Sequence, residues 1–80
     1  MGDEEIERDA RLGLIKNTRI DMTEVNLAVS NGEVRVTGRV PSYVLRRIAE
    51  YVIFTVPGVV NIINDLEVGA SPGRRRSVAA

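Results

Sequence analysis

Hydrophobic residues alternate with polar or small residues in two neighbouring segments, 25–29 and 34–40. Asn31-Gly32 stands between them. Alternation on both sides of an Asn-Gly pair is a strong hairpin signal, because the tight turn needs positive φ at both central residues. The pattern therefore predicts an antiparallel hairpin over residues 24–40. The side chains expected to face the core are Val25, Leu27, Val29, Val34, Val36 and Val40.

Residues 3–17 have the spacing of an amphipathic helix, with Asp3 as the expected N-cap. One face of this helix carries Ile6, Ala10, Gly13, Leu14 and Asn17. Glycine costs about 1 kcal/mol relative to alanine inside a helix, so Gly13 indicates a close approach of helix to sheet. In the connector that follows, Asp21 and Thr23 are turn formers.

A second helix is predicted from Ser42, its N-cap, to Val56, where Pro57-Gly58 ends it. Its expected core face holds Val44, Leu45, Ile48, Ala49, Val52 and Val56. Turns are expected at Asn31, Gly32, Gly38 and Gly58.

A third strand is predicted over residues 59–68, and the right-handed crossover makes it parallel to the second strand. Its expected core residues are Val60, Ile62, Leu66 and Val68, although Val59 and Ile63 blur the alternation. The fold class is α+β: an α-β-β-α-β sandwich whose three-stranded mixed sheet carries both helices on one face. The opposite face, with Arg35 and Arg39 among acidic neighbours, predicts solvated cross-strand ion pairs.

The charge of the chain is zero overall but uneven along its length. Without Arg74–Arg76 it has 8 basic and 11 acidic residues, a net charge of −3. The predicted domain therefore offers no bulk attraction to nucleic acid or anionic lipid. We expect one domain over residues 1–68 and a disordered basic tail or linker over residues 69–80. The alternative interpretations of this tail are a cloning or truncation remnant and an electrostatic tether.

The 80 residues include neither cysteine nor histidine. Disulfides and Cys- or His-ligated metal sites are therefore excluded, and the usual general bases and best nucleophiles are missing. The sequence also lacks a glycine-rich phosphate loop and a calcium-loop pattern. We predict that the protein is not an enzyme and needs no cofactor or metal.

Several short motifs occur in a recognisable order: Asn31-Gly32, then residues 36–40 (Val-Thr-Gly-Arg-Val), Ala49-Glu50, Gly58-Val59 and residues 62–68 (Ile-Ile-Asn-Asp-Leu-Glu-Val). Over about residues 3–68 the chain resembles the BON domain family, named from bacterial osmotically induced and nodulation proteins. The resemblance implies a non-catalytic module that binds phospholipid or partners and supports the bacterial cell envelope under osmotic stress. The acidic N-terminus is unlike a signal peptide, so a cytoplasmic protein or an excised domain is the alternative to the envelope.

All the aromatic residues of the chain lie on the second predicted helix, and most of them lie opposite its core face. The candidate binding residues there are Tyr43, Arg46, Arg47, Phe54 and Tyr51, and the outer face of the first helix adds Leu12 and Ile15. Such a patch suits an anionic phospholipid surface or, alternatively, a protein partner or second copy of the chain. The other interpretation is rings lying over the rim of a small core. Nucleic acid is an unlikely ligand, because the sheet offers no aromatic stacking platform.

Overall fold

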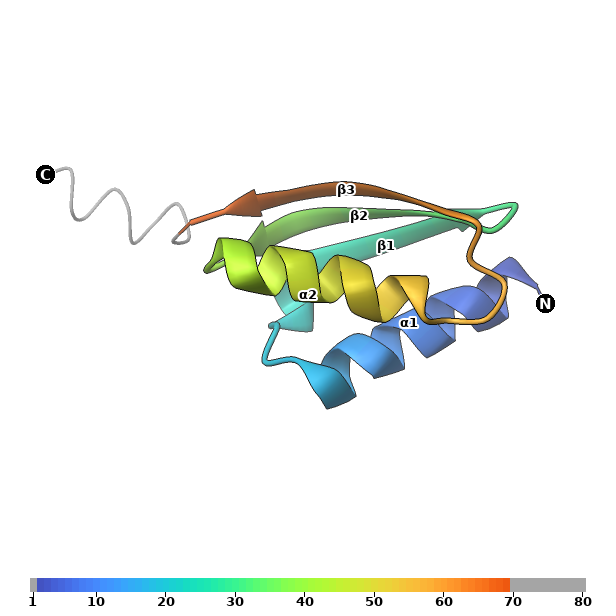
Figure 1. Ribbon diagram of the computed structural model, residues 1–80, viewed down its shortest axis with the longest axis horizontal. Helices are drawn as coiled ribbons and strands as arrows, with labels where there is room; N and C mark the ends of the chain where they lie inside the picture. The colour runs from blue at the N-terminus through green and yellow to red at the C-terminus, as the bar shows by residue number, and fades with distance from the viewer. Residues whose placement is uncertain (1, 70–80) are drawn as a thin grey trace, which may run out of the picture.

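The computed structural model describes residues 2–69, which form one layer of sheet and one layer of helices (Figure 1). The elements are α1 (Asp3–Asn17), the short 3₁₀ turn η1 (Met22–Glu24), β1 (Val25–Ser30), β2 (Glu33–Val40), α2 (Tyr43–Phe54) and β3 (Asn61–Val68). The predicted α-β-β-α-β order and α+β class are confirmed. The tail expected over residues 69–80 lies, beyond Gly69, outside the described residues.

The sheet has the order β1-β2-β3, with β2 in the middle. β1 and β2 are antiparallel, with Ser30 opposite Glu33. Asn31 and Gly32 form the two-residue turn with φ of 52° and 82°, as a type I′ turn requires. β3 runs parallel to β2, so the predicted crossover is confirmed.

The core lies between the sheet and the two helices, which cover the same sheet face (Figure 1). Val34 and Val36 of β2 are fully buried because β2 has a neighbour on each side and helices beneath it. Leu27 and Val29 of the outer strand β1 belong to the same apolar set but are only partly buried. The core is therefore densest under β2 and thins toward β1.

The buried stripe of α2 differs from the predicted one. Ile53 is fully buried, whereas Val44 and Ile48, both expected in the core, are exposed. The apolar residues of α2 extend around more of the helix than a core-facing stripe of roughly 100° can hold. In the observed orientation of α2, Arg46 lies against β3 and Ile53 rather than Ile48 lies in the core.

Gly13 marks a close approach, but the approach joins two helices rather than helix and sheet. A Cβ at this position would lie 3.0 Å from Cγ1 of Val52 on α2. The small residue therefore lets α1 and α2 pack side by side on the sheet.

Asp3 is not the N-cap of α1, because Gly2 holds that position. The backbone N–H of Gly2 donates to Oε1 of Glu5 at 3.2 Å. Asp3 lies in the first helical turn, and its carboxylate reaches the hairpin turn: the N–H groups of Asn31 and Gly32 donate to it at 2.9 and 3.2 Å. The predicted cap of α2 is confirmed, since the N–H of Leu45 donates to Oγ of Ser42.

Val60 was expected in the core but is exposed. It precedes β3, which begins at Asn61, and its N–H donates to the carbonyl oxygen of Gly32 at 2.9 Å. This bond fixes the backbone against the hairpin turn and leaves the side chain in solvent.

Candidate functional site

The outer side of α2 is an exposed surface rich in apolar and aromatic side chains. Tyr43 and Tyr51 are each 72% exposed, Val44 is 65% exposed and Phe54 is 64% exposed. At 100° per residue these side chains fall within an arc of about 140° that also includes Arg47 and Ile48. We call this set the α2 surface; it consists of Tyr43, Val44, Arg47, Ile48, Tyr51 and Phe54.

A shallow hollow of about 280 Å³ lies on the flank of the α2 surface. It is lined by Arg47, Glu50, Tyr51 and Phe54. Oε1 of Glu50 accepts a hydrogen bond from Nδ2 of Asn64 at 3.1 Å, which holds the carboxylate toward β3. The hollow thus combines one cation and one anion with two aromatic rings.

Arg46 takes a different place from the one that the sequence suggested. Its Nε and one terminal nitrogen donate to the carbonyl oxygens of Leu66 and Asn64, at 3.0 and 2.9 Å. Nδ2 of Asn64 donates in return to the carbonyl oxygen of Arg46 at 3.2 Å. Arg46 therefore ties α2 to the edge of β3, and Arg47 is the basic residue left on the α2 surface.

Leu12 and Ile15 of α1 are exposed, as expected, at 45% and 52%. They are three positions apart in sequence, so they lie about 60° apart around α1. Their role as an extension of the α2 surface stays a prediction.

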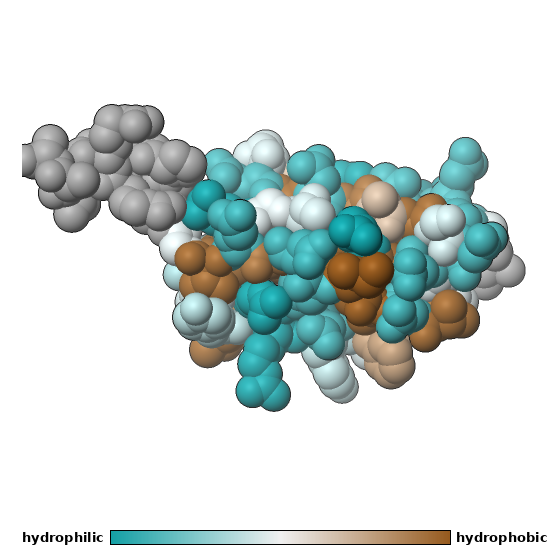
Figure 2. All heavy atoms as spheres, turned by 90° about the horizontal axis from the view of Figure 1, so that it is seen from above, coloured by the Kyte–Doolittle hydropathy of each residue, from teal (hydrophilic) through white to brown (hydrophobic). Residues whose placement is uncertain are grey.

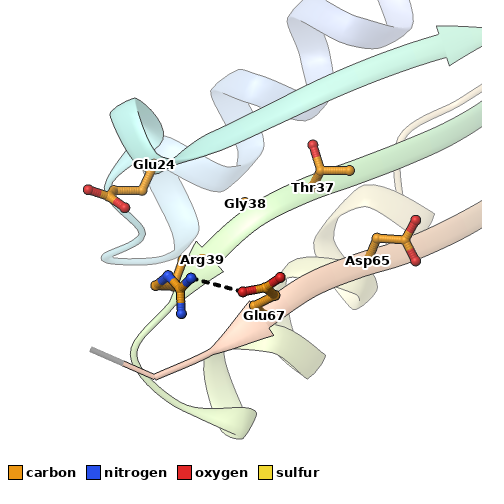
Figure 3. Close-up of a pocket in the computed structure, with 6 residues that line it drawn as sticks. All are labelled: Glu24, Thr37, Gly38, Arg39, Asp65 and Glu67. Atoms are coloured by element: carbon orange, nitrogen blue, oxygen red, sulfur yellow. Dashed lines mark hydrogen bonds and ion pairs between the residues drawn. The ribbon is translucent and has the colours of Figure 1, made fainter. Parts of the chain in front are cut away.

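The face of the sheet away from the helices is polar and carries two cross-strand ion pairs. Arg35 contacts Asp65 at 3.0 Å and Arg39 contacts Glu67 at 2.9 Å, which confirms the predicted cross-strand ion pairs. Figure 3 shows Arg39 and Glu67 beside an open hollow of about 470 Å³ that also borders Glu24, Thr37, Gly38 and Asp65. Figure 2 shows the molecule from above relative to Figure 1. Hydrophilic side chains predominate in this view, and hydrophobic ones form separate spots.

Gly38 sits inside β2 with a φ of 123°, rather than in a turn. A Cβ there would overlap the carbonyl oxygen of Glu24, where η1 leads into β1. Gly58, with a φ of 98°, lies in the turn between α2 and β3 as predicted, but α2 ends at Phe54, with Thr55 as its C-cap, rather than at Val56.

Few groups within residues 2–69 are suited to chemistry. No cluster of three or more carboxylates that could hold a metal ion occurs in this part of the chain, and none of its helices is long and apolar enough to cross a membrane. The pKa of Asp21 lies below its ordinary value because the hydroxyl and the backbone N–H of Thr23 both donate to the carboxylate. This feature stabilises a turn and is remote in sequence from α2.

Sequence reasoning missed Val44 and Ile48 as surface residues. Both are aliphatic, and an aliphatic residue in an amphipathic helix is normally assigned to the core. The available signal was the excess of apolar positions on this helix, which is more than one buried stripe accommodates.

Comparison with solved structures finds a similar fold in CdsD, described as "the structural protein of the Type III secretion system of Chlamydia trachomatis: C-terminal domain". The TM-score is 0.70 at 14% sequence identity, and the match covers 85% of this chain and 34% of that one. The likeness is one of fold. Comparison with curated proteins finds no match.

The model of the BON domain matches residues 2–70, which include all the helices and strands described above. The hairpin with its Asn-Gly turn, the crossover helix and the parallel third strand are the parts on which the resemblance rested. The chain belongs to the BON domain family.

Proposed function

We propose that this BON domain is a non-catalytic binding module that associates with anionic phospholipid surfaces through the α2 surface. The observation that carries the proposal is the exposure of Tyr43, Val44, Tyr51 and Phe54 on one side of a single helix. Single exposed apolar residues are ordinary, whereas a grouped set on one helix face is typical of a contact surface.

Aromatic rings suit the headgroup region of a bilayer, because they present an apolar body and, in tyrosine, a polar tip. Arg47 supplies a cation for a lipid phosphate, while Arg46 is occupied by β3. One basic residue near an anionic surface contributes about 1 kcal/mol, or about a fivefold gain in affinity. Apolar insertion therefore provides most of the binding, and lipid charge modulates it.

The test is co-sedimentation with vesicles of phosphatidylcholine, with and without about 30% phosphatidylglycerol. We expect the double substitution Phe54→Asp and Arg47→Glu to abolish binding to both kinds of vesicle. The matched control is Val60→Asp with Arg19→Glu, which makes the same changes of charge at exposed positions outside α2. Equal binding by the two variants would contradict the proposal.

A protein partner is the second candidate, favoured by the hollow beside the α2 surface. Arg47, Glu50, Tyr51 and Phe54 offer both charges and two rings in one recess, a composition that suits a protein interface. The similar fold of CdsD, described as a structural protein of a secretion system, supports an assembly role of this kind. This candidate would be favoured if the domain did not bind vesicles but its mass rose with concentration, and if Phe54→Asp removed that rise.

The biological setting that we propose is the bacterial cell envelope under osmotic stress. This part of the proposal rests on membership of the BON family and the roles that the resemblance implies. Sensitivity of a deletion strain to osmotic shock, rescued by the unchanged chain but not by Phe54→Asp, would support it.

A further inference from the structure

The two edges of the sheet differ in how their backbone groups are satisfied. At the outer edge of β3, Arg46 takes the carbonyl oxygens of Asn64 and Leu66. Oδ1 of Asn64 accepts from the N–H of Leu66 at 3.2 Å. Side chains of the domain itself thus occupy successive polar groups along this edge, which would otherwise pair with another strand.

The outer edge of β1 has no such cover. Ser30 and Glu33 close a two-residue turn and form a hydrogen-bonded pair, so by antiparallel alternation Val25, Leu27 and Val29 point their backbone groups away from β2. The N–H of Val25 donates to the carbonyl oxygen of Met22. Within residues 2–69, no backbone–backbone hydrogen bond outside the strand pairing involves Leu27 or Val29.

The side chains of β1 also lack the features that keep edge strands apart. The sequence of β1 is Val-Asn-Leu-Ala-Val-Ser, with no charged residue and no proline. Proteins usually protect an exposed edge with charges, proline, bulges or a covering element. Leu27 and Val29 are moreover only partly buried, so apolar area remains beside the open backbone.

We propose that β1 pairs with β1 of a second copy of this chain, antiparallel and about a two-fold axis. Leu27 lies opposite Leu27 of the other copy and exchanges two hydrogen bonds with it. Each Val29 N–H donates to the Val25 carbonyl oxygen of the other copy, a group that η1 leaves open. The lack of charge on β1 makes the strand compatible with itself, since no like charges are brought together.

The product is a continuous six-stranded sheet with β3 at both ends. Because Arg46 and Asn64 close the edge of β3, the pairing stops at two copies rather than growing into a fibre. The paired edges are short, and an interface below about 1,200 Å² is characteristic of a transient complex. This inference is independent of the α2 surface, which lies on a helix at the other side of the domain from β1.

The experiment is sedimentation velocity of the full chain from about 10 µM to about 1 mM, with the double substitution Asn26→Lys and Ala28→Lys. Both side chains are exposed, and in the proposed register each faces the other across the axis. The new like charges should raise the dimer dissociation constant by about tenfold or more. Val44→Lys with Ile48→Lys, which adds the same charge on the α2 surface, should leave it unchanged.

A second measurement keeps the test independent of folding. Hydrogen exchange at the Leu27 and Val29 amides should slow as the concentration of the unchanged chain rises, while exchange in β3 stays constant. The proposal would be overturned if the chain stayed monomeric over the whole concentration range. It would also be overturned if exchange at the Leu27 and Val29 amides did not change with concentration. A dimer that the α2 charges disrupt and the β1 charges do not would overturn it too, because it would place the second copy on the α2 surface.

Discussion

The carboxylate of Asp3 and the backbone N–H of Asn31 are joined at 2.9 Å across 28 residues of sequence. The same carboxylate accepts from the N–H of Gly32 at 3.2 Å. An acidic residue in the first turn of α1 thereby satisfies both donors of the type I′ turn. This contact holds the start of α1 against the end of the sheet at which the hairpin turns (Figure 1).

Replacing Asp3 should therefore destabilise the domain. We expect Asp3→Ala to lower the free energy of unfolding by about 1–2 kcal/mol, since two charge-assisted hydrogen bonds are lost. Glu4→Ala removes the same charge from the same helical turn and should change it by less than about 0.5 kcal/mol. Urea unfolding followed by circular dichroism measures both, and equal losses would show that only the helix dipole is involved.

Arg46 and Arg47 are neighbours with opposite roles, so their substitution should separate stability from binding. Arg46→Ala leaves partly buried carbonyl oxygens of β3 without donors and should cost about 1–3 kcal/mol. Arg47→Ala, at an exposed position, should cost less than about 0.5 kcal/mol. Arg46→Lys should recover only part of the loss, because an ammonium lacks the planar fork of donors. Thermal unfolding of the three variants measures these losses. If Arg47→Ala were more destabilising than Arg46→Ala, the assignment of Arg46 to stability and Arg47 to binding would be wrong.

Gly38 should tolerate no side chain. Its φ of 123° and the overlap of a Cβ with the carbonyl oxygen of Glu24 predict that Gly38→Ala destabilises the domain by about 3 kcal/mol or more. Gly2→Ala is the control, because Gly2 has a φ of −86° and open space around it. The amide spectrum of Gly38→Ala should show loss of folded signals; a spectrum like that of the control would mean that β2 accommodates the side chain.

The pH dependence of stability should reflect Asp21. Hydrogen bonds from Thr23 lower the pKa of this carboxyl in the folded state, so its contribution is present above the unfolded pKa and is lost as pH falls through the folded pKa. Thr23→Ala removes the hydroxyl donor and should raise the pKa of Asp21 toward its ordinary value. Carbon-detected titration of the Asp21 carboxyl measures the shift, and an unchanged pKa would remove the hydroxyl as its main cause.

The parts of this fold that were predictable from sequence are those encoded locally. Asn31-Gly32 between alternating segments specifies the hairpin, and Ser42 specifies the start of α2. The parts that were not predictable depend on contacts between distant residues. The hydrogen bonds of Asp3 to the hairpin turn and of Arg46 to β3 are contacts of this kind.

The candidate site also has features that are encoded locally and features that depend on contacts between distant residues. The grouping of Tyr43 and Phe54 on one side of α2 follows from helical periodicity, and both are exposed. The different roles of Arg46 and Arg47 do not follow from periodicity alone. Adjacent residues lie 100° apart around the helix, and which of the two meets β3 depends on where β3 lies. The number of basic groups available to a phosphate was therefore overestimated from sequence.

The most direct test of the proposed function is an NMR titration of the labelled chain with anionic and zwitterionic lipid bicelles. The account predicts shifts at Tyr43, Val44, Arg47, Tyr51 and Phe54 with both lipids, larger with the anionic one, and none at Arg46 or along β1. Absence of shifts on α2 with either lipid, or shifts confined to β1, would contradict the proposal that the α2 surface binds phospholipid.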